Sequence, residues 1–137
     1  MSELKQNIKN HKKIISIYGL GNVGGAIAAS WLRAGSKVIG VDLSDKLLKD
    51  IKTGRSHKKE PFVSEVFSKA LKTKNLVLTK DGVNASKNSD IKIIVVPVAI
   101  TRTKTDLSNV ISVAQTISQG LKKGDAVVLS PSVPPGT

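Results

Sequence analysis

A glycine-rich turn is the first stretch of the sequence whose spacing points to chemistry. Gly19, Gly21 and Gly24 form a G-x-G-x-x-G pattern that directly follows the β-branched run 14–18 and opens a helical pattern. The first glycine permits a tight turn, the second lets the backbone approach a pyrophosphate, and the third allows close packing of helix on strand. Free N–H groups at the helix start would face the phosphates. We therefore expect the whole turn to bind a dinucleotide: Gly19, Leu20, Gly21, Asn22, Val23 and Gly24.

An acidic residue at the end of the next β-branched run supports the same interpretation. Asp42 closes the run 37–42 and stands 18 residues after Gly24. A carboxylate in that place accepts hydrogen bonds from the adenosine ribose, and it repels a 2′-phosphate. The pair of features predicts NAD, and favours it over NADP, as the cofactor. Two simpler alternatives stay open: a plain strand-to-helix connection for the glycines, and a helix-cap or turn role for Asp42.

Two later segments end at the same predicted edge of the sheet. Residues 91–96 form an apolar run that leads into Val95, Val96, Pro97 and Val98, and Ser132 follows the run 126–129. Because doubly wound folds bind ligands at the carboxyl ends of their strands, we expect residues 95–98 and Ser132 to line the cofactor cleft. Ser132 is also a candidate for a supporting catalytic role through its hydroxyl. Pro97 equally fits a residue that only terminates a strand, and loop serines are commonly solvated.

The sequence contains few residues that could bind a metal or carry out thiol chemistry. It contains no cysteine, which excludes disulfides, cysteine-ligated zinc and thiolate catalysis from the residues present. The two histidines, His11 and His57, are far apart and lie outside any metal-spacing pattern, so no metal site is expected. We interpret His57, which stands among Arg55, Lys58 and Lys59, as a surface residue of a polar loop.

Length and composition indicate one globular domain. The 137 residues are 39% hydrophobic and 23% charged, so we divide the chain into a basic N-terminal extension (1–13) and a single domain (14–137). The longest apolar stretch, 91–100, is broken by Lys92 and Pro97 and is shorter than the roughly 20 residues of a membrane span. The polar N-terminus lacks the apolar core of a signal peptide. We expect a cytoplasmic protein with no membrane partner.

The formal charge of +12 indicates attraction to anions. Basic residues are concentrated in the segments 5–13 and 46–74. Aromatic residues make up only 3% of the chain, which leaves few side chains to stack on bases, and no nucleic-acid-binding motif is present. We expect a solvated lysine-rich surface and no specific nucleic-acid partner.

The elements that must position these residues alternate between strands and helices. Strands are predicted at 14–18, 37–42, 76–79, 91–96 and 126–129. Helices are predicted at 22–34, from a Ser44 cap to 52, at 60–72 opened by Pro61, and at 107–121. This alternation predicts an α/β fold of the Rossmann type, a doubly wound parallel sheet between two helical layers in a single domain.

With these segments in order, the chain resembles the N-terminal part of the UDP-glucose/GDP-mannose dehydrogenase family, the nucleotide-sugar dehydrogenases. The resemblance rests on the segments 17–24, 38–42, 54–61, 106–110, and 122–125 leading to 132–137. The ordered set is more specific than the glycine pattern alone. The loop 54–61 is slightly more similar to the UDP-N-acetylmannosamine dehydrogenase branch than to the UDP-glucose branch.

The resemblance implies an NAD-dependent oxidation of a UDP-sugar at its C6 alcohol, twice over, to the uronic acid through a cysteine-bound intermediate. It implies that residues 19–24 bind the pyrophosphate, Asp42 binds the adenosine ribose and residues 95–98 line the cleft. Ser132 stands where the family usually has a threonine whose hydroxyl helps in the active site. The intact family enzymes usually form dimers, so a homodimer is expected for the complete protein.

The chain also departs from the family pattern at several positions. Asn22 replaces a common aromatic residue, Gly25 and Ala26 replace a bulkier pair, Val98 stands for a threonine and Ser130 for a glutamate. The family places its catalytic cysteine, lysine and asparagine and its sugar-nucleotide domain after the matched segment. We therefore expect this chain to be the NAD-binding portion of a longer enzyme, inactive on its own.

Two hypotheses of other classes remain open at this point. One is a free-standing NAD-binding or redox-sensing module without catalysis, which predicts the same cofactor binding. The other is a basic interaction domain on the same sheet scaffold, which predicts steeply salt-dependent binding to nucleic acid.

Overall fold

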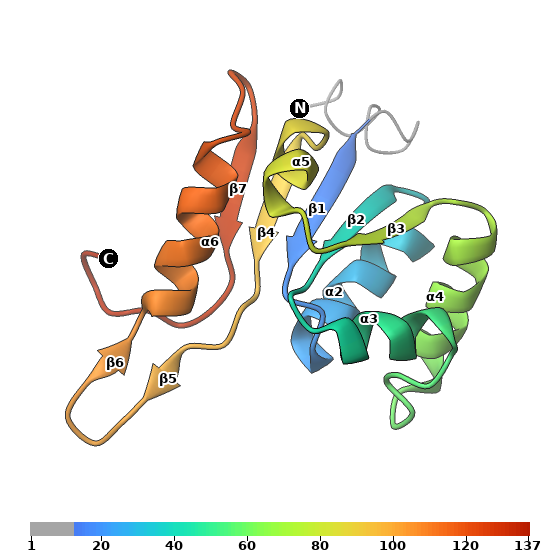
Figure 1. Ribbon diagram of the computed structural model, residues 1–137, viewed down its shortest axis with the longest axis horizontal. Coiled ribbons are helices and arrows are strands. Elements are labelled where there is room, and N and C mark those ends of the chain that lie inside the picture. Colours follow the sequence, from blue (N-terminus) through green and yellow to red (C-terminus); the bar gives the residue numbers. More distant parts are fainter. Residues whose placement is uncertain (1–12) are drawn as a thin grey trace.

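Five parallel strands form the central sheet in the computed structural model, which describes residues 13–137 (Figure 1). The predicted N-terminal extension, residues 1–13, lies outside the described residues except for Lys13. The strand order is β3-β2-β1-β4-β7, which confirms the predicted doubly wound parallel sheet. The strand bounds are β1 (Ile14–Tyr18), β2 (Lys37–Val41), β3 (Leu76–Thr79), β4 (Ile91–Ile94) and β7 (Ala126–Leu129).

Helices cover both faces of the sheet. The first layer packs on β1, β2 and β3, and the second packs on β1, β2 and β4 (Figure 1). The first layer consists of α2 (Asn22–Arg33), α3 (Asp45–Lys52) and α4 (Pro61–Lys72). The second layer consists of α5 (Gly82–Lys87) and α6 (Ser108–Ser118). Connections between parallel neighbours therefore run over the faces, as the strand–helix alternation predicts.

Alternating side chains of β1 supply the core on both sides of the sheet. Ile15 and Ile17 are fully buried in the core beneath α2 and α4, together with Phe67. Tyr18 belongs to a smaller core on the α5–α6 side. Because β1 is buried on both faces and paired on both edges, the turn that follows it starts from a fixed position.

Local sequence signals explain where several elements begin. The Ser44 hydroxyl caps α3 by accepting a hydrogen bond from the Leu47 N–H (3.2 Å), and Pro61 occupies the first turn of α4. Strand β4 ends at Ile94, earlier than predicted. Val95 still donates from its N–H to the Tyr18 carbonyl (2.8 Å), but Pro97 has no N–H to continue the ladder.

Three short elements are absent from the sequence prediction. Helix α5 has only six residues, too few for a helical period to stand out, and begins where the Asp81 side chain accepts from the Asn84 N–H (3.0 Å). A two-stranded antiparallel hairpin, β5 (Ala99–Ile100) and β6 (Thr105–Asp106), projects beyond the sheet (Figure 1). Its turn is closed by the Thr101 hydroxyl, which donates to the Lys104 carbonyl (3.0 Å).

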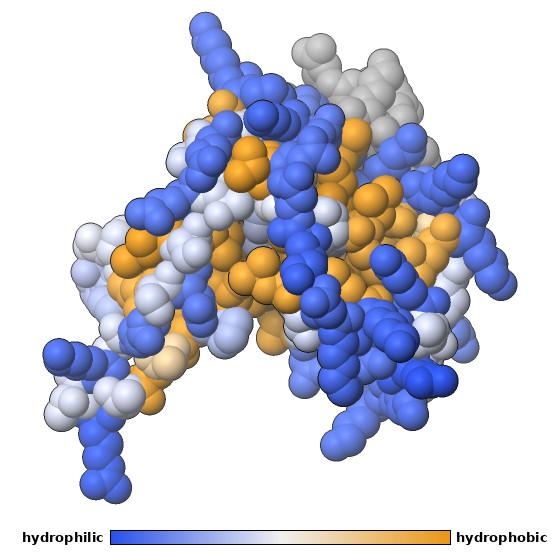
Figure 2. Space-filling model, in the orientation of Figure 1, coloured by the Kyte–Doolittle hydropathy of each residue, from blue (hydrophilic) through white to orange (hydrophobic). Residues whose placement is uncertain are grey.

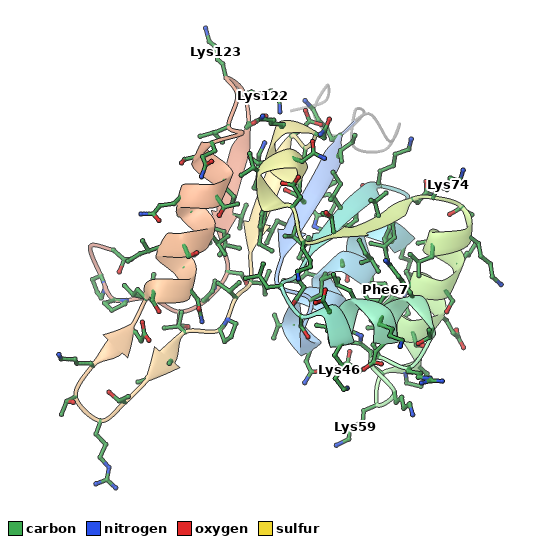
Figure 3. All side chains as sticks on the ribbon, in the orientation of Figure 1. Lys46, Lys59, Phe67, Lys74, Lys122 and Lys123 are labelled. Carbon is green, nitrogen blue, oxygen red and sulfur yellow. The ribbon has the colours of Figure 1, made fainter. Side chains whose placement is uncertain are left out.

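Basic side chains extend outward around the molecule. Figure 3 shows Lys46, Lys59 and Lys74 extending from the α3–α4 side, and Lys122 and Lys123 at the opposite end. Figure 2, in the same view, shows hydrophobic residues gathered toward the middle of the molecule, with hydrophilic residues around and across them. Within residues 13–137, no helix combines the length and apolar character needed to cross a membrane.

A buried ion pair joins two strands at the amino end of the sheet. The Lys92 ammonium on β4 is fully buried, donates to the Ser89 carbonyl (2.6 Å) and pairs with the Asp125 carboxylate just before β7. The Lys122 N–H also donates to Asp125 (2.8 Å). Burial raises the pKa of the Asp125 carboxyl, but the hydrogen bonds and positive charge of Lys92 and Lys122 outweigh it and hold that pKa below its usual range.

Replacing Asp125 with alanine is expected to destabilise the domain by about 3–5 kcal/mol, because it leaves the Lys92 ammonium buried without its partner. Adding Lys92→Met removes the orphaned charge and should recover most of that loss. Chemical denaturation of the two single variants and the double variant measures the coupling. Strictly additive losses would contradict a coupled buried pair.

The same pair predicts an acid limit to stability. Because the folded-state pKa of Asp125 lies below the unfolded value of about 3.9, its contribution is complete above that value and disappears as the pH falls through the folded-state pKa. Stability of the unsubstituted protein should therefore fall more steeply below about pH 4 than that of the Asp125→Ala variant.

Candidate dinucleotide-binding site

A cavity of about 860 Å³ opens at the carboxyl ends of the parallel strands. It lies at the point where the strand order reverses, between β1 and β4, which is the place where doubly wound sheets leave a crevice. Its volume suits a ligand of dinucleotide size. All but one of the predicted cofactor residues line it: Gly19, Gly21, Asn22, Val23, Gly24, Asp42, Val95, Val96, Pro97, Val98 and Ser132.

The exception is Leu20, whose side chain is fully buried in the core beneath α2. Its backbone still takes part in the site, because the Leu20 N–H donates to a carboxylate oxygen of Asp42 (3.0 Å). Leu20 thus anchors the turn through its side chain and holds Asp42 through its backbone.

Two of the three glycines in the turn are required by the fold itself. Gly19 has a φ of +104°, and a Cβ atom there would lie 2.9 Å from the Val95 carbonyl oxygen. A Cβ atom on Gly24 would lie 1.8 Å from the Gly19 carbonyl oxygen. Side chains at these positions would force β1, α2 and the end of β4 apart.

The third glycine, Gly21, has no such internal reason. Its φ is −66°, which any residue adopts, and no atom lies within 4 Å of the place where a Cβ would stand. Gly21 nevertheless lines the cavity. The space that a side chain would fill is therefore available to a ligand.

The start of α2 offers hydrogen-bond donors to the same space. Among residues 13–137, no group accepts a hydrogen bond from the backbone N–H of Gly21, Asn22 or Val23. These N–H groups carry the positive end of the helix dipole. An anionic group such as a pyrophosphate would satisfy them.

Asp42 is fixed at the rim of the cavity by two backbone donors. One carboxylate oxygen accepts from the Leu20 N–H (3.0 Å) and the other from the Ser44 N–H (2.9 Å). The hydrogen bond from the Ser44 N–H is the turn role that the sequence left open for Asp42. Since each carboxylate oxygen has a further lone pair, the same side chain can also accept hydrogen bonds from ribose hydroxyls.

One face of α6 closes the cavity on its far side, which the sequence prediction did not identify. Asn109, Ser112, Val113 and Thr116 line it with the helical spacing i, i+3, i+4, i+7. The three polar residues on one face of that helix were the available signal. Further lining residues outside the prediction are Tyr18, Val41, Leu43, Leu47, Lys80, Gly82, Ile100, Ser130 and Pro131.

Tyr18 is a neutral donor at the end of β1 beside this cavity. Its hydroxyl donates to the Gly82 carbonyl (2.8 Å), and burial raises the pKa of the phenol above its usual value. Ser132 is exposed and lines the cavity from the loop after β7, and within residues 13–137 its hydroxyl has no hydrogen-bond partner.

His57 is only partly exposed and makes inward contacts that its interpretation as a surface residue did not anticipate. Its ring is partly buried, with Nε2 placed 3.1 Å from both the Leu20 and the Gly21 carbonyl oxygens. It packs edge-on against Phe67, with 5.5 Å between ring centroids. The backbone of His57 is left-handed (φ 54°), a conformation that the polar composition of the loop does not reveal.

Comparison with known proteins is consistent with this geometry. A model of the UDP-glucose/GDP-mannose dehydrogenase family, NAD binding domain, matches residues 13–137. The chain belongs to this family. NAD is accordingly the cofactor of the domain, as predicted from the glycine turn and Asp42.

Several relatives are similar in sequence or structure to nearly the whole of this chain. The UDP-N-acetyl-D-mannosamine dehydrogenase of Methanococcus vannielii is 33% identical over 139 aligned residues, covering 97% of this chain and 30% of the relative. The structure of UDP-D-ManNAc dehydrogenase from Pyrococcus horikoshii superposes with a TM-score of 0.82 at 28% identity, covering 90% of this chain and 29% of that one.

A ternary complex of GDP-mannose dehydrogenase from Pseudomonas aeruginosa gives a TM-score of 0.81 at 31% identity, covering 89% of this chain and 29% of that one. The present chain therefore spans about 30% of the length of the relatives that it matches.

Replacing Gly21 with alanine is expected to weaken NAD binding about tenfold or more, because the new methyl group enters ligand space and overpacking costs ~1–3 kcal/mol. The free energy of unfolding should change by less than about 1 kcal/mol, since φ is ordinary and no protein atom is near. Calorimetric titration with NAD and denaturant unfolding measure the two effects.

Gly24→Ala is the matched control within the same motif. Its Cβ meets the Gly19 carbonyl, so the expected result is a loss of folding stability rather than a selective loss of affinity. Equal NAD affinities for Gly21→Ala and the unsubstituted protein would contradict a ligand at this turn.

Proposed function

We propose that this chain is the NAD-binding part of a nucleotide-sugar dehydrogenase that oxidises the C6 alcohol of a UDP-sugar to the uronic acid. The observation that carries the proposal is the empty space beside Gly21, in one cavity with the Asp42 carboxylate. Family membership and the names of the relatives support it. The preferred substrate is UDP-N-acetylmannosamine, in line with the loop 54–61 and with several relatives so named.

The residues of the cavity divide the binding of the cofactor among them. The N–H groups of Gly21, Asn22 and Val23 hold the pyrophosphate, and Asp42 accepts hydrogen bonds from the adenosine ribose hydroxyls. Leu43 and Leu47 provide apolar surface beside Asp42 for the adenine. Bound NAD supplies a hydride acceptor for the sugar alcohol.

The nicotinamide end of NAD occupies the other half of the cavity. Val96, Pro97 and Val98 line that half on one side and the loop 130–132 on the other. The apolar side chains exclude water from the reacting carbon, and the Ser132 hydroxyl contributes a polar contact at the cavity rim.

The sugar, and the thiol that family chemistry uses, require residues beyond those of this sequence. None of the 137 residues is a cysteine, so the covalent step belongs to other polypeptide in the same enzyme. The same holds for recognition of the UDP-sugar and for the expected homodimer.

Cofactor choice tests the Asp42 role. NAD should bind at least about tenfold more tightly than NADP, because the carboxylate accepts the ribose hydroxyls and repels a 2′-phosphate. Asp42→Ala should weaken NAD binding and abolish the preference. Asp50→Ala removes the same charge from α3, where Asp50 pairs with Lys46 and does not line the cavity, and should change neither. Equal affinity of the unsubstituted protein for NAD and NADP would refute the cofactor role of Asp42.

Substrate class is tested in the longer protein that carries this chain. Supplied with NAD and UDP-N-acetylmannosamine, it should reduce two NAD for each sugar converted to the acid, faster than with UDP-glucose. If NAD binds normally but no UDP-sugar is oxidised, the substrate proposal is refuted while the cofactor assignment survives.

A further inference from the structure

The loop between α3 and α4 reaches the underside of the glycine turn through one side chain. His57 Nε2 lies 3.1 Å from the Leu20 carbonyl oxygen and 3.1 Å from that of Gly21. Carbonyl oxygens only accept, so Nε2 carries the proton and shares it between the two. Nδ1 is then the acceptor for the Ser56 hydroxyl (2.9 Å).

The planarity of the peptide bond gives this contact a consequence on the other side of the turn. In a trans peptide, the carbonyl of one residue points opposite to the N–H of the next. Fixing the Leu20 and Gly21 carbonyls against His57 therefore aims the N–H groups of Gly21 and Asn22 away from it. These are the residues that line the cavity and whose N–H groups have no acceptor among residues 13–137.

We propose that His57 is a positioning residue for the pyrophosphate, holding the donors of the glycine turn in their binding orientation through the carbonyls behind them. The inference rests on the proposed function of the turn. His57 does not touch the cofactor in this role; it sets the direction of the backbone groups that do.

The ring is held in this place from several sides. Phe67 packs against it edge-on at 85°, and the Phe67 side chain is itself 1% exposed in the core. The backbone of His57 adopts a left-handed φ of 54°, which costs about 1 kcal/mol in a residue other than glycine. Such a conformation persists where the surroundings enforce it, and it occurs preferentially at functional sites.

The absence of a side chain at Gly25 leaves room for the His57 ring. A Cβ atom at position 25 would lie 2.4 Å from His57 Nε2. A side chain at position 25 would therefore displace the ring from both carbonyls. Gly25 and His57, 32 positions apart in the sequence, are therefore coupled.

The start of α2 does not depend on His57 for its own hydrogen bonding. The Gly21 carbonyl already accepts from the Gly25 N–H (2.7 Å), which begins the helix. The helix therefore does not need the additional hydrogen bond from His57 in order to begin. That bond mainly fixes the orientation of the turn, and with it the direction of the N–H groups that would contact a ligand.

Two substitutions of His57 separate its donor from its bulk. Asn tolerates the left-handed backbone but is too short to reach the carbonyls, whereas Gln carries an N–H donor at about the same reach. His57→Asn should weaken binding of NAD and of ADP-ribose about fivefold to tenfold, the effect of losing one hydrogen bond. His57→Gln should restore affinity to within about twofold of the unsubstituted protein.

Adenosine distinguishes positioning from a general structural effect. It contacts Asp42 but carries no pyrophosphate, so its affinity, followed by NMR titration, should be unchanged in His57→Asn. Thermal unfolding without ligand confirms that each variant is folded. Equal losses for adenosine and ADP-ribose would show a structural role only and overturn the proposal.

The coupling between His57 and Gly25 provides a second, independent test. Gly25→Ala should weaken NAD binding by displacing the ring, and the same change in the His57→Asn background should cost nothing further. Additive losses would overturn the proposal, as would unchanged NAD affinity in His57→Asn. If the unsubstituted protein binds no NAD at all, the proposed function fails and the positioning role fails with it.

Discussion

The close approach of backbone to backbone at the end of β1 is the constraint on which the rest of the site depends. Gly24 comes so near to the Gly19 carbonyl, and Gly19 so near to the Val95 carbonyl, that neither position admits a side chain. This contact draws the start of α2 and the end of β4 to the same point. The donors of the helix and the apolar residues 95–98 consequently face one cavity.

The two ends of the sheet treat their polar groups in opposite ways. At the amino end, Lys92 and Asp125 are buried and satisfy each other, so their charges are used within the fold. At the carboxyl end, Asp42 is held by two backbone donors with lone pairs to spare, and N–H groups of the turn have no partner within residues 13–137. The free hydrogen-bonding capacity of the fold is thus concentrated at the carboxyl end of the sheet.

Much of this architecture is predictable from the sequence because its signals are local. Strands 14–18, 76–79 and 126–129 are bounded by abrupt changes in composition, and the structure places them at those residues. The Ser44 cap and Pro61 mark helix starts correctly. The glycine spacing and Asp42 are equally local, and residues 95–98 and Ser132 are predictable in the same cavity because they follow the carboxyl ends of parallel strands.

What the sequence does not show depends on tertiary contact or on too few residues. Helix α5 and the β5–β6 hairpin are shorter than a recognisable period. The α6 face joins the site only because a crossover places that helix beside β4. His57 stands in a run of charged residues typical of solvent, and only its left-handed backbone and the ring contact with Phe67 bring it beneath the turn.

The most direct test of how this domain binds its cofactor is a crystal structure with NAD. The pyrophosphate oxygens should lie within hydrogen-bond distance of the backbone N–H groups of Gly21 and Asn22, with the adenosine ribose hydroxyls on the Asp42 carboxylate. A nucleotide bound elsewhere, or a pyrophosphate held by surface lysines away from the glycine turn, would contradict this mode of binding.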